Sequence, residues 1–462
     1  MTRRDIVVIG GGIAGLSVAY ELHTRGLRAS VLERAPRPGG VILSETIEGF
    51  TIDAGPDALL VQKPDGIKLC QELGLLDTLI PTKPPRIAYI QRGGRLHPLP
   101  AASVLGIPTR VRPFVTTSLF SLTGKLRMAA EWFVPPKRDD VDESIAGFMT
   151  RRFGTEATTY LAEPLLAGIH AGDVDRLSIA SLFPQLVETE RANGSLLRGF
   201  RRRQRPATGE GAFRSFPGGL SQLVNRLSAV LPDDTVRLNT TVTRVTTVNG
   251  PAAYVVETAN GETLPARAVV CAAPAFAASA ILRELDQSLA QLCGEVPYAS
   301  TATVVLAFRR TDVRHTLDGS GFVVPRVEST GILAASWLSS KWAHRAPADM
   351  ALMRTFVGGA RDPRALERPD DELIRLSLAA LSPLLGISAP PLMTRVYRWE
   401  RASAQHEVGH AARLDAIERS IAQHPGLFVT GSGFRGVGIP DCIADGRATG
   451  KQVAEWLAQS RS

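Results

Sequence analysis

Three glycines near the N-terminus of the 462-residue chain have the spacing that dinucleotide binding needs. Gly10, Gly12 and Gly15 form G-x-G-x-x-G between the apolar run "IVVIG" and the amphipathic run "AGLSVAYELHTRG". The first glycine allows a tight turn, the second lets the backbone approach a pyrophosphate, and the third lets the helix pack on the strand. The helix N-terminus then faces the phosphates. The predicted chemistry is recognition of a dinucleotide through its pyrophosphate.

A second predicted strand, within "LRASVLER", ends at Glu33, where an acid holds ribose hydroxyls. Glu33 favours an unphosphorylated ribose, whereas Arg34 would tolerate a 2′-phosphate. The basic "MTRR" and the apolar run after it also match two parts of an export signal. Asp5 and the glycines favour strand, turn and helix instead. A glycine-rich turn that binds nothing is the remaining alternative.

Length and composition indicate an enzyme of more than one domain. The chain is 44% hydrophobic, which is ample for burial, and its length exceeds one ordinary core. Its four cysteines, Cys70, Cys271, Cys293 and Cys442, lack zinc spacing, so we expect reduced core residues and no metal. Together with the lack of an apolar run long enough to span a membrane, this favours the cytosol.

Positive charge predominates, with 53 Lys and Arg against 45 Asp and Glu, and should attract carboxylate substrates, anionic lipid or nucleic acid. The densest cluster consists of Arg198, Arg201, Arg202, Arg203 and Arg205. Because it has no interleaved aromatic residues and no recognisable nucleic-acid module, nucleic acid is not an expected partner. The cluster is either a solvated loop or a basic rim beside a polyanionic substrate.

The order of predicted elements indicates an α/β chain whose first domain is interrupted. Residues 1–82, 200–290 and 395–462 are assigned to the dinucleotide-binding domain. Residues 83–199 are predicted to form a helical insertion that covers the substrate pocket. Residues 291–394 are predicted to form a largely antiparallel or mixed sheet for the substrate.

The chain ends much as it begins, because "GLFVTGSGFRGVGIPDCIADGR" predicts a strand, a glycine-rich turn and a helix with Pro440 in its first turn. The second half of a dinucleotide could meet this helix at residues 438–441. If the cofactor is a flavin, the positive helix end would stabilise the charge of the reduced ring by about 1 kcal/mol or more. An ordinary strand–helix connection is the alternative.

Together, "GGGIAGL", Glu33, "RPGG", "DAGPD" and "GVGIPDCIADGR" resemble the FAD signature of glutathione-reductase-type flavoproteins. Within that group, "EPLLAGIHAGD", "GIPTRVRPF" and "FPGGLSQL" are similar to the porphyrinogen oxidases of haem biosynthesis. The similarity is closer to the soluble bacterial coproporphyrinogen III oxidases than to the membrane-associated protoporphyrinogen oxidases. It implies a Rossmann-like FAD-binding domain beside a substrate sheet domain and a helical insertion.

The resemblance implies oxidation of a tetrapyrrole, a porphyrinogen, to the porphyrin in three two-electron steps. Each step passes hydride to FAD, which molecular oxygen reoxidises. The flavin performs this chemistry, so no catalytic side chain is expected and the site needs chiefly a flat apolar slot. Coproporphyrinogen III is favoured over protoporphyrinogen IX, and the sequence leaves that choice open.

Position by position, the resemblance implies FAD contacts along the two glycine-rich turns and the strands beside them. Val242 is expected near the adenine, and Trp399 near the isoalloxazine. The implied contacts are Gly10, Gly11, Gly12, Ile13, Ala14, Gly15, Glu33, Arg34, Gly40, Val41, Gly55, Pro56, Asp57, Ala58, Val242, Trp399, Val437, Gly438 and Ile439.

Three residues are substrate candidates. Gly168 matches the family glycine that leaves room for a pyrrole ring, although a helix-to-loop glycine has the same pattern. Arg86 matches a propionate-binding arginine and Lys63 follows the predicted flavin loop, with a solvated surface cation as the alternative for both. Two histidines, His170 and His410, are expected to be structural.

One departure from the family is that Ala404, Gln405 and His406 stand where Pro-Gln-Tyr is common. Two other functions stay open: a related amine or polyene oxidase, and a non-catalytic lipid-binding escort protein on the same fold. The segment "VRPFVTTSLFSL" is expected to form a pocket wall, with peripheral membrane contact as its alternative. The sequence predicts no oligomeric state.

Overall fold

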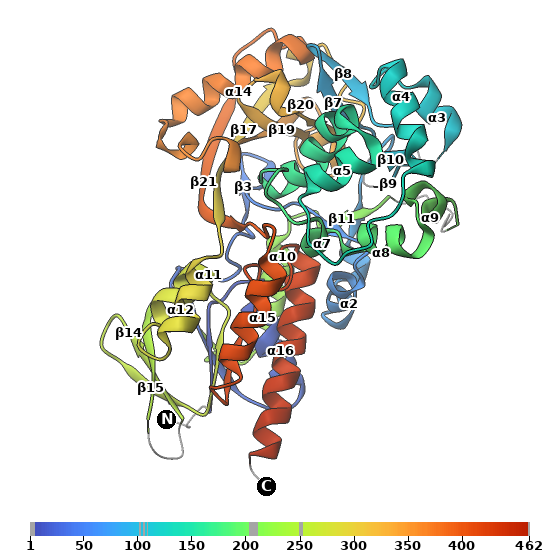
Figure 1. Cartoon of the computed structure of the whole chain (residues 1–462). Helices are drawn as coiled ribbons and strands as arrows, with labels where there is room; N and C mark the ends of the chain where they lie inside the picture. The colour runs from blue at the N-terminus through green and yellow to red at the C-terminus, as the bar shows by residue number, and fades with distance from the viewer. Residues whose placement is uncertain are drawn as a thin grey trace.

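The computed structural model describes residues 5–100, 103–104, 107–108, 110–202, 211–248 and 253–460. They form two lobes, which are easily distinguished in Figure 1. The lower lobe contains a parallel sheet with the long helix α16 (Ile439–Gln459) beside it. The upper lobe contains the largest sheet, covered by helix α14 (Asp370–Leu385) and flanked by the helices of residues 110–202.

The parallel sheet draws its strands from distant parts of the chain. Its order is β12-β2-β1-β16-β22, and every neighbouring pair is parallel. The central strands are apolar and buried throughout, as expected of a parallel sheet covered on both faces. The strands are β1 (Ile6–Ile9), β2 (Ala29–Leu32), β12 (Val236–Arg237), β16 (Ala268–Cys271) and β22 (Leu427–Val429).

Helix α16 packs along helix α1 (Ile13–Thr24), and two glycines set their separation. A Cβ on Gly446 would lie 2.4 Å from the Ala14 carbonyl oxygen, and one on Gly450 would lie 3.0 Å from that of Val18. Residue numbers rise together from the first contact (Ala14 with Gly446) to the second (Val18 with Gly450), so the two helices are parallel. Their N-termini therefore point to the same end of the lobe, the carboxyl edge of the sheet.

The upper sheet has seven strands in the order β21-β17-β20-β19-β18-β7-β8. Neighbours are antiparallel except β18 and β7, so the predicted mixed sheet is confirmed. The strands are β7 (Ala88–Arg92), β8 (Arg95–Pro98), β17 (Tyr298–Arg309), β18 (Gly321–Val323), β19 (Ile332–Trp337), β20 (Met350–Gly358) and β21 (Met393–Ala404).

Two of these strands come from the range predicted to be helical. Gly93 and Gly94, both with positive φ, form the turn that joins β7 to β8, and this hairpin adds to one edge of the sheet. Helices follow from Val111 onward. The parallel sheet contains segments from all three ranges assigned to the dinucleotide-binding domain, while the four boundaries between the ranges stay a prediction.

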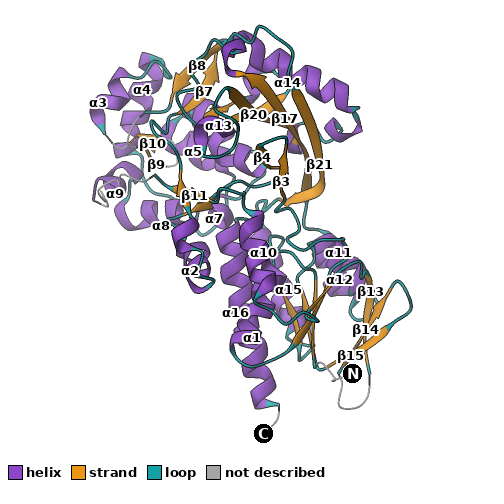
Figure 2. Ribbon diagram, turned by 180° about the vertical axis from the view of Figure 1, so that it is seen from behind, coloured by secondary structure: helices purple, strands orange, loops and turns teal. Residues whose placement is uncertain are grey.

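Shorter strands form four small sheets, and further helices surround both lobes (Figure 2). The strands are β3 (Ser44–Ile47), β4 (Phe50–Asp53), β5 (Leu59–Leu60), β6 (Ile80–Pro81), β9 (Ser103–Val104), β10 (Ile107–Pro108), β11 (Phe213–Ser215), β13 (Val242–Thr247), β14 (Tyr254–Thr258) and β15 (Thr263–Ala266). The helices outside the insertion include α2 (Pro64–Glu72), α10 (Ser221–Ala229), α11 (Ala275–Ile281), α12 (Gln287–Gly294), α13 (Leu338–Lys341) and α15 (His410–Ile421).

The insertion is built mainly from short helices. They are α3 (Val111–Thr116), α4 (Leu122–Ala129), η2 (Ala130–Phe133), α5 (Ile145–Phe153), α6 (Thr155–Ala157), the π-helix η3 (Thr158–Ala167), η4 (Gly168–His170), α7 (Ile179–Leu182), α8 (Pro184–Asn193) and α9 (Leu196–Arg202). Among the described residues, no helix is both long and apolar enough to cross a membrane.

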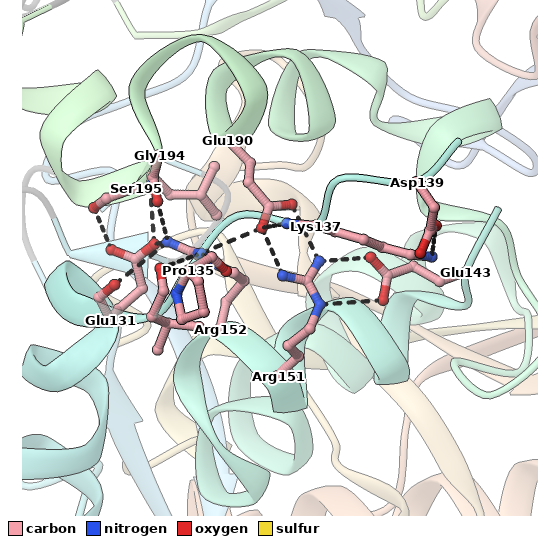
Figure 3. A network of polar contacts seen from close by, with 12 residues as sticks. Glu131, Pro135, Lys137, Asp139, Glu143, Arg151, Arg152, Glu190, Gly194 and Ser195 are labelled. Carbon is pink, nitrogen blue, oxygen red and sulfur yellow. Dashed lines mark hydrogen bonds and ion pairs between the residues drawn. The ribbon is translucent and has the colours of Figure 1, made fainter. Parts of the chain in front are cut away.

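A buried ion-pair network joins these helices (Figure 3). The Arg152 guanidinium on α5 pairs with the carboxylates of Glu131 and Glu190, and the side chains of Arg152 and Glu131 are fully buried. Glu131 also accepts the backbone N–H of Leu196, 2.9 Å away, and the Ser195 hydroxyl, 2.6 Å away. The network therefore ties the start of α9 to η2 and α5.

Part of the predicted basic cluster packs against an aromatic residue. The guanidinium groups of Arg198 and Arg201 lie 5.0 and 5.6 Å from the Trp132 ring centre. Arg198 also donates a hydrogen bond to the Trp132 carbonyl. The cation–π contacts and this hydrogen bond attach α9 to η2. Arg203 and Arg205 lie outside the described residues.

We expect Arg152→Met to lower the free energy of unfolding by about 3–5 kcal/mol, because Glu131 would keep a buried, uncompensated charge. Arg191→Met is the matched control, since Arg191 pairs with Asp140 at the exposed surface. Its effect should stay below about 1 kcal/mol. Urea denaturation of both variants measures the difference, and equal losses would contradict a special role for the buried pair.

Candidate active site

The first glycine-rich turn lies at the carboxyl edge of the parallel sheet. Gly10 has φ +107°, and a Cβ on Gly15 would lie 2.0 Å from the Gly10 carbonyl oxygen, so only glycine fits either position. In contrast, no atom lies within 4 Å of where a Cβ on Gly12 would stand. Helix α1 has neither a side-chain cap nor an acid in its first turn. This open, uncapped N-terminus fits a pyrophosphate.

Glu33 is held beside that turn. Its carboxylate accepts the Gly11 N–H at 2.7 Å and the Ala35 N–H at 2.8 Å. Each carboxylate oxygen retains a further lone pair for a ribose hydroxyl. Val242, predicted near the adenine, is buried in the same hydrophobic cluster as Leu32 at the end of β2. The side chain of Arg34 is exposed.

A second turn covers the first. The Gly39 N–H donates to the Gly11 carbonyl at 2.8 Å, and Gly40 approaches Gly12 closely. The Arg37 guanidinium donates to the carbonyl oxygens of Gly40 (2.7 Å) and Ile42 (2.9 Å), and so holds the turn together. The predicted contacts Gly40 and Val41 therefore lie next to the first turn.

Trp399 and the loop of residues 53–58 come together from opposite ends of the chain. The Trp399 indole N–H donates to the Ala54 carbonyl at 3.0 Å. A Cβ on Gly55 would lie 2.1 Å from the Val41 carbonyl and 3.6 Å from the Trp399 ring. Gly55 thus lies next to both Val41 and Trp399, two residues that were predicted separately from it. Pro56 and Ala58 are half-buried in the same loop.

The side chain of Asp57 is already engaged by the substrate sheet domain. Its carboxylate accepts Lys341 Nζ at 2.7 Å and Trp342 Nε1 at 3.0 Å, and pairs with Arg354 at 3.4 Å. Burial opposes ionisation, yet Lys341 and Arg354 hold the pKa of Asp57 well below its usual value. Any cofactor contact of Asp57 would therefore come from its backbone.

Arg354 also shapes the loop directly. Its guanidinium donates to the carbonyl oxygens of Asp53 (2.5 Å) and Gly55 (2.7 Å). Neither Arg354 on β20 nor Lys341 on α13 was predicted to act at this site. Both are separated from the loop by about 300 residues and belong to no local motif, so only the tertiary structure identifies them.

The second helix N-terminus, at Gly438, carries an ion pair. Asp441 Oδ2 accepts the Gly438 N–H at 3.2 Å and Lys63 Nζ at 2.5 Å. Gly66 on α2 lies against Pro440, so the first turns of α2 and α16 are in contact. The positive helix end that was predicted beside a flavin is therefore accompanied by the Lys63–Asp441 pair.

The turn η4 carries Gly168 at its start and His170 at its end. Burial and the positive charge of Lys63 lower the pKa of His170 to about 4, while Asp441 acts in the opposite direction. The charges of the Lys63–Asp441 pair therefore act on η4, two residues from Gly168. Arg86 Nε donates to the Thr82 carbonyl at 2.9 Å, and the side chain lies beside Gly211.

The sequence matches the model of the family described as flavin containing amine oxidoreductase over residues 13–454. The chain belongs to this family. As a member of it, the chain is a flavin-dependent oxidoreductase with FAD as its cofactor, and the glycine turns and Glu33 suit that dinucleotide. The mixed α/β architecture is that of FAD-dependent oxidases of the family.

Two curated relatives match this family member over almost its full length. A coproporphyrinogen III oxidase of Bacillus subtilis (strain 168) is 35% identical, covering 98% of this chain and 99% of the relative. A coproporphyrinogen III oxidase of Staphylococcus aureus (strain NCTC 8325 / PS 47) is 34% identical, covering 98% and 100%. A crystal structure from Exiguobacterium sp. 255-15, provisionally named a protoporphyrinogen oxidase, superposes with TM-score 0.85 at 31% identity, covering 98% and 99%.

We expect the free energy of unfolding to fall as pH decreases from about 6.5 to about 4. The unfolded chain protonates His170 in this range while the folded protein does not, so one histidine contributes at most about 1.4 kcal/mol per pH unit. His170→Gln should flatten the dependence, whereas the same change at the exposed His344 should not. Urea denaturation at pH 7, 6 and 5 measures the slopes, and parallel curves for the His170 variant and the wild type would contradict the assignment.

Proposed function

We propose that this flavoprotein oxidises a porphyrinogen to the porphyrin in haem biosynthesis, with coproporphyrinogen III as the favoured substrate. The observation that carries the proposal is that η4, the turn of Gly168 and His170, is joined through Gln405 and His406 to the turn that leads into α16. Lys63 pairs with Asp441 in the first turn of α16, and both charges act on His170, two residues from Gly168. The two curated bacterial relatives, both named coproporphyrinogen III oxidase, support the same conclusion.

In this proposal the cofactor extends between the two helix N-termini. The turn of residues 10–15 would hold the pyrophosphate, Glu33 a ribose, and Val242 the adenine. Residues 55–58, Trp399 and residues 437–439 would surround the isoalloxazine. The support is that the parallel packing of α1 and α16 directs both N-termini to one edge of the sheet.

When bound, FAD would accept a hydride in each of three two-electron steps and return the electrons to molecular oxygen. The protein would bind and orient the tetrapyrrole and exclude water. His170 is neutral at physiological pH because its pKa is about 4, so it would add no charge beside the ring. Lys63 could attract a propionate, since Asp441 leaves it half-exposed. Arg86, whose Nε donates to the Thr82 carbonyl, stays a second candidate for a propionate.

The decisive experiment is aerobic oxidation of coproporphyrinogen III and protoporphyrinogen IX by the FAD-loaded protein, followed through porphyrin fluorescence. A higher kcat/KM for the four-carboxylate substrate is expected. Preference for protoporphyrinogen IX would overturn the substrate choice. A flavin-containing protein that oxidises neither would restore the amine or polyene oxidase, and a protein that binds no flavin would restore the lipid-binding escort protein.

Gly168→Val should lower kcat/KM for the porphyrinogen by about 100-fold or more and leave FAD bound. The nearest atom to a Cβ on Gly168 is the Glu163 carbonyl oxygen at 3.6 Å, an ordinary contact, so the fold should accept a side chain. The substituent would instead occupy space predicted for a pyrrole ring. Flavin absorbance and steady-state kinetics measure both quantities, and unchanged kinetics would place the substrate elsewhere.

We further propose a cytosolic enzyme with peripheral membrane contact. The four cysteines are buried and unpaired, which supports a reducing compartment. The segment expected to form a pocket wall is divided: Leu119 and Phe120 are buried, but Val111 is 73% exposed. Other exposed apolar side chains nearby are Val115, Leu122, Leu126 and Phe133.

Figures 1 and 2 show α3 and α4 together at one outer corner of the upper lobe. Apolar side chains at such a corner would enter a lipid interface, and Lys125 on α4 would favour anionic headgroups. We expect co-sedimentation with anionic vesicles that Leu122→Glu with Leu126→Glu abolishes. Equal co-sedimentation of variant and wild type would contradict this contact.

A further inference from the structure

Residues 403–410, here called the clasp, lie between two parts of the proposed site. The clasp begins at the end of β21, the strand that carries Trp399, and ends at His410, the first residue of α15. On one side of it are residues 168–172, the substrate-side loop. On the other side are residues 431–438, the flavin-side turn that leads into α16. The clasp includes Ala404 and His406, which stand where the family that this chain resembles commonly has Pro and Tyr, and Gln405 between them.

The clasp holds the substrate-side loop chiefly through the His170 carbonyl oxygen. The Ser403 hydroxyl and Gln405 Nε2 both donate to the His170 carbonyl, at 2.8 and 2.9 Å. Gln405 also packs against Gly172, where a Cβ would lie 2.5 Å from Gln405 Oε1. The loop is therefore attached to the clasp at two successive points.

Two histidines hold the flavin-side turn. His406 Nε2 lies 2.9 Å from the Ser432 carbonyl oxygen, and His410 Nε2 lies 2.8 Å from that of Phe434. A carbonyl can only accept, so each Nε2 carries the hydrogen. The two imidazole rings are stacked, with centroids 3.8 Å apart and planes 9° apart. Both residues are buried.

Both imidazoles are neutral at physiological pH. Burial and the neighbouring His410 lower the pKa of His406 to about 3, and His170 acts in the same direction. Burial also lowers the pKa of His410, where Arg413 and Asp142 have opposing effects. A proton on either ring would place a charge in a stacked, buried pair. The arrangement therefore persists across the pH range in which an enzyme works.

We propose that the stacked pair of His406 and His410 positions the flavin-side turn against the substrate-side loop, so that FAD binding and the order of the substrate-side loop are coupled. A continuous series of contacts carries this coupling: the Ser432 carbonyl, His406, the clasp backbone, Gln405 and the His170 carbonyl. Coupling of this kind is reciprocal, so occupancy of either side favours the other. The inference rests on the proposed flavin position beside residues 437–439 and does not depend on which porphyrinogen is the substrate.

The test replaces His406 by phenylalanine and by glutamine. Phenylalanine keeps a stacked ring but leaves the Ser432 carbonyl without its donor, whereas the glutamine amide can restore the donor. We expect His406→Phe to weaken FAD binding about ten-fold and to change the visible circular dichroism of bound flavin, and His406→Gln to recover most of both. Far-UV circular dichroism and thermal unfolding verify that each variant folds.

Hydrogen–deuterium exchange of apo and FAD-loaded protein measures the coupling itself. In the wild type, FAD should slow exchange in residues 431–438 and also in residues 168–172. In His406→Phe only the first protection should remain. The matched control is His424→Phe, since His424 Nε2 also makes one hydrogen bond, at 2.9 Å to Asp286, away from the clasp. This control should keep the wild-type FAD affinity and both protections.

Two results would overturn the proposal, and they are distinguishable. If the folded His406→Phe protein keeps the wild-type FAD affinity and protects residues 168–172 normally, the pair does not couple the two segments. If FAD fails to protect residues 431–438 even in the wild type, the flavin is not beside the turn, and the proposed site is wrong as well. Neither result requires a porphyrinogen, so both are independent of the substrate assignment.

Discussion

The close parallel packing of α1 and α16 is the constraint on which the rest of the structure depends. Gly446 and Gly450 let the two backbones approach to a distance that a single Cβ would prevent. Because the helices run in the same direction, the N-terminus of each points to the carboxyl edge of the parallel sheet. An extended dinucleotide needs two such ends, one for its pyrophosphate and one for its second half. The proposed cofactor site therefore draws on both the first and the last segment of the chain.

Charged residues from the upper lobe complete that site. Asp57 is paired with Lys341 and Arg354, and Asp53 with the buried Arg345, so the loop of residues 53–58 is held by residues of the upper lobe. Buried ion pairs contribute little net stability, because removing charges from water offsets most of their attraction. These ion pairs instead fix the position of the loop of residues 53–58 relative to the upper lobe. The network around Arg152 has the same effect within the helical insertion.

Much of the fold could be predicted from local patterns. The strand, turn and helix at residues 6–24 follow from an apolar run, three spaced glycines and an amphipathic run, and all three elements are present. The mixed sheet was also predicted correctly, and it contains the long strands β17 and β20. The hairpin β7–β8 was missed, because short strands in a range dominated by helices give a weak signal. Its place in the sheet depends on pairing with β18, more than 200 residues away.

By itself, the sequence determined that the chain is a member of a flavin-dependent family and where its glycines and Glu33 must lie. Those features depend on neighbours within a few residues, and backbone geometry leaves few other solutions. Only the tertiary structure decided that Lys63 pairs with Asp441, that Arg354 holds the Asp53 and Gly55 carbonyls, and that His406 stacks on His410. The first two of these contacts join residues about 300 or more positions apart, and the third depends on how the clasp packs between two loops. Their partners are set by strand register and helix packing, which leave no local pattern in the sequence.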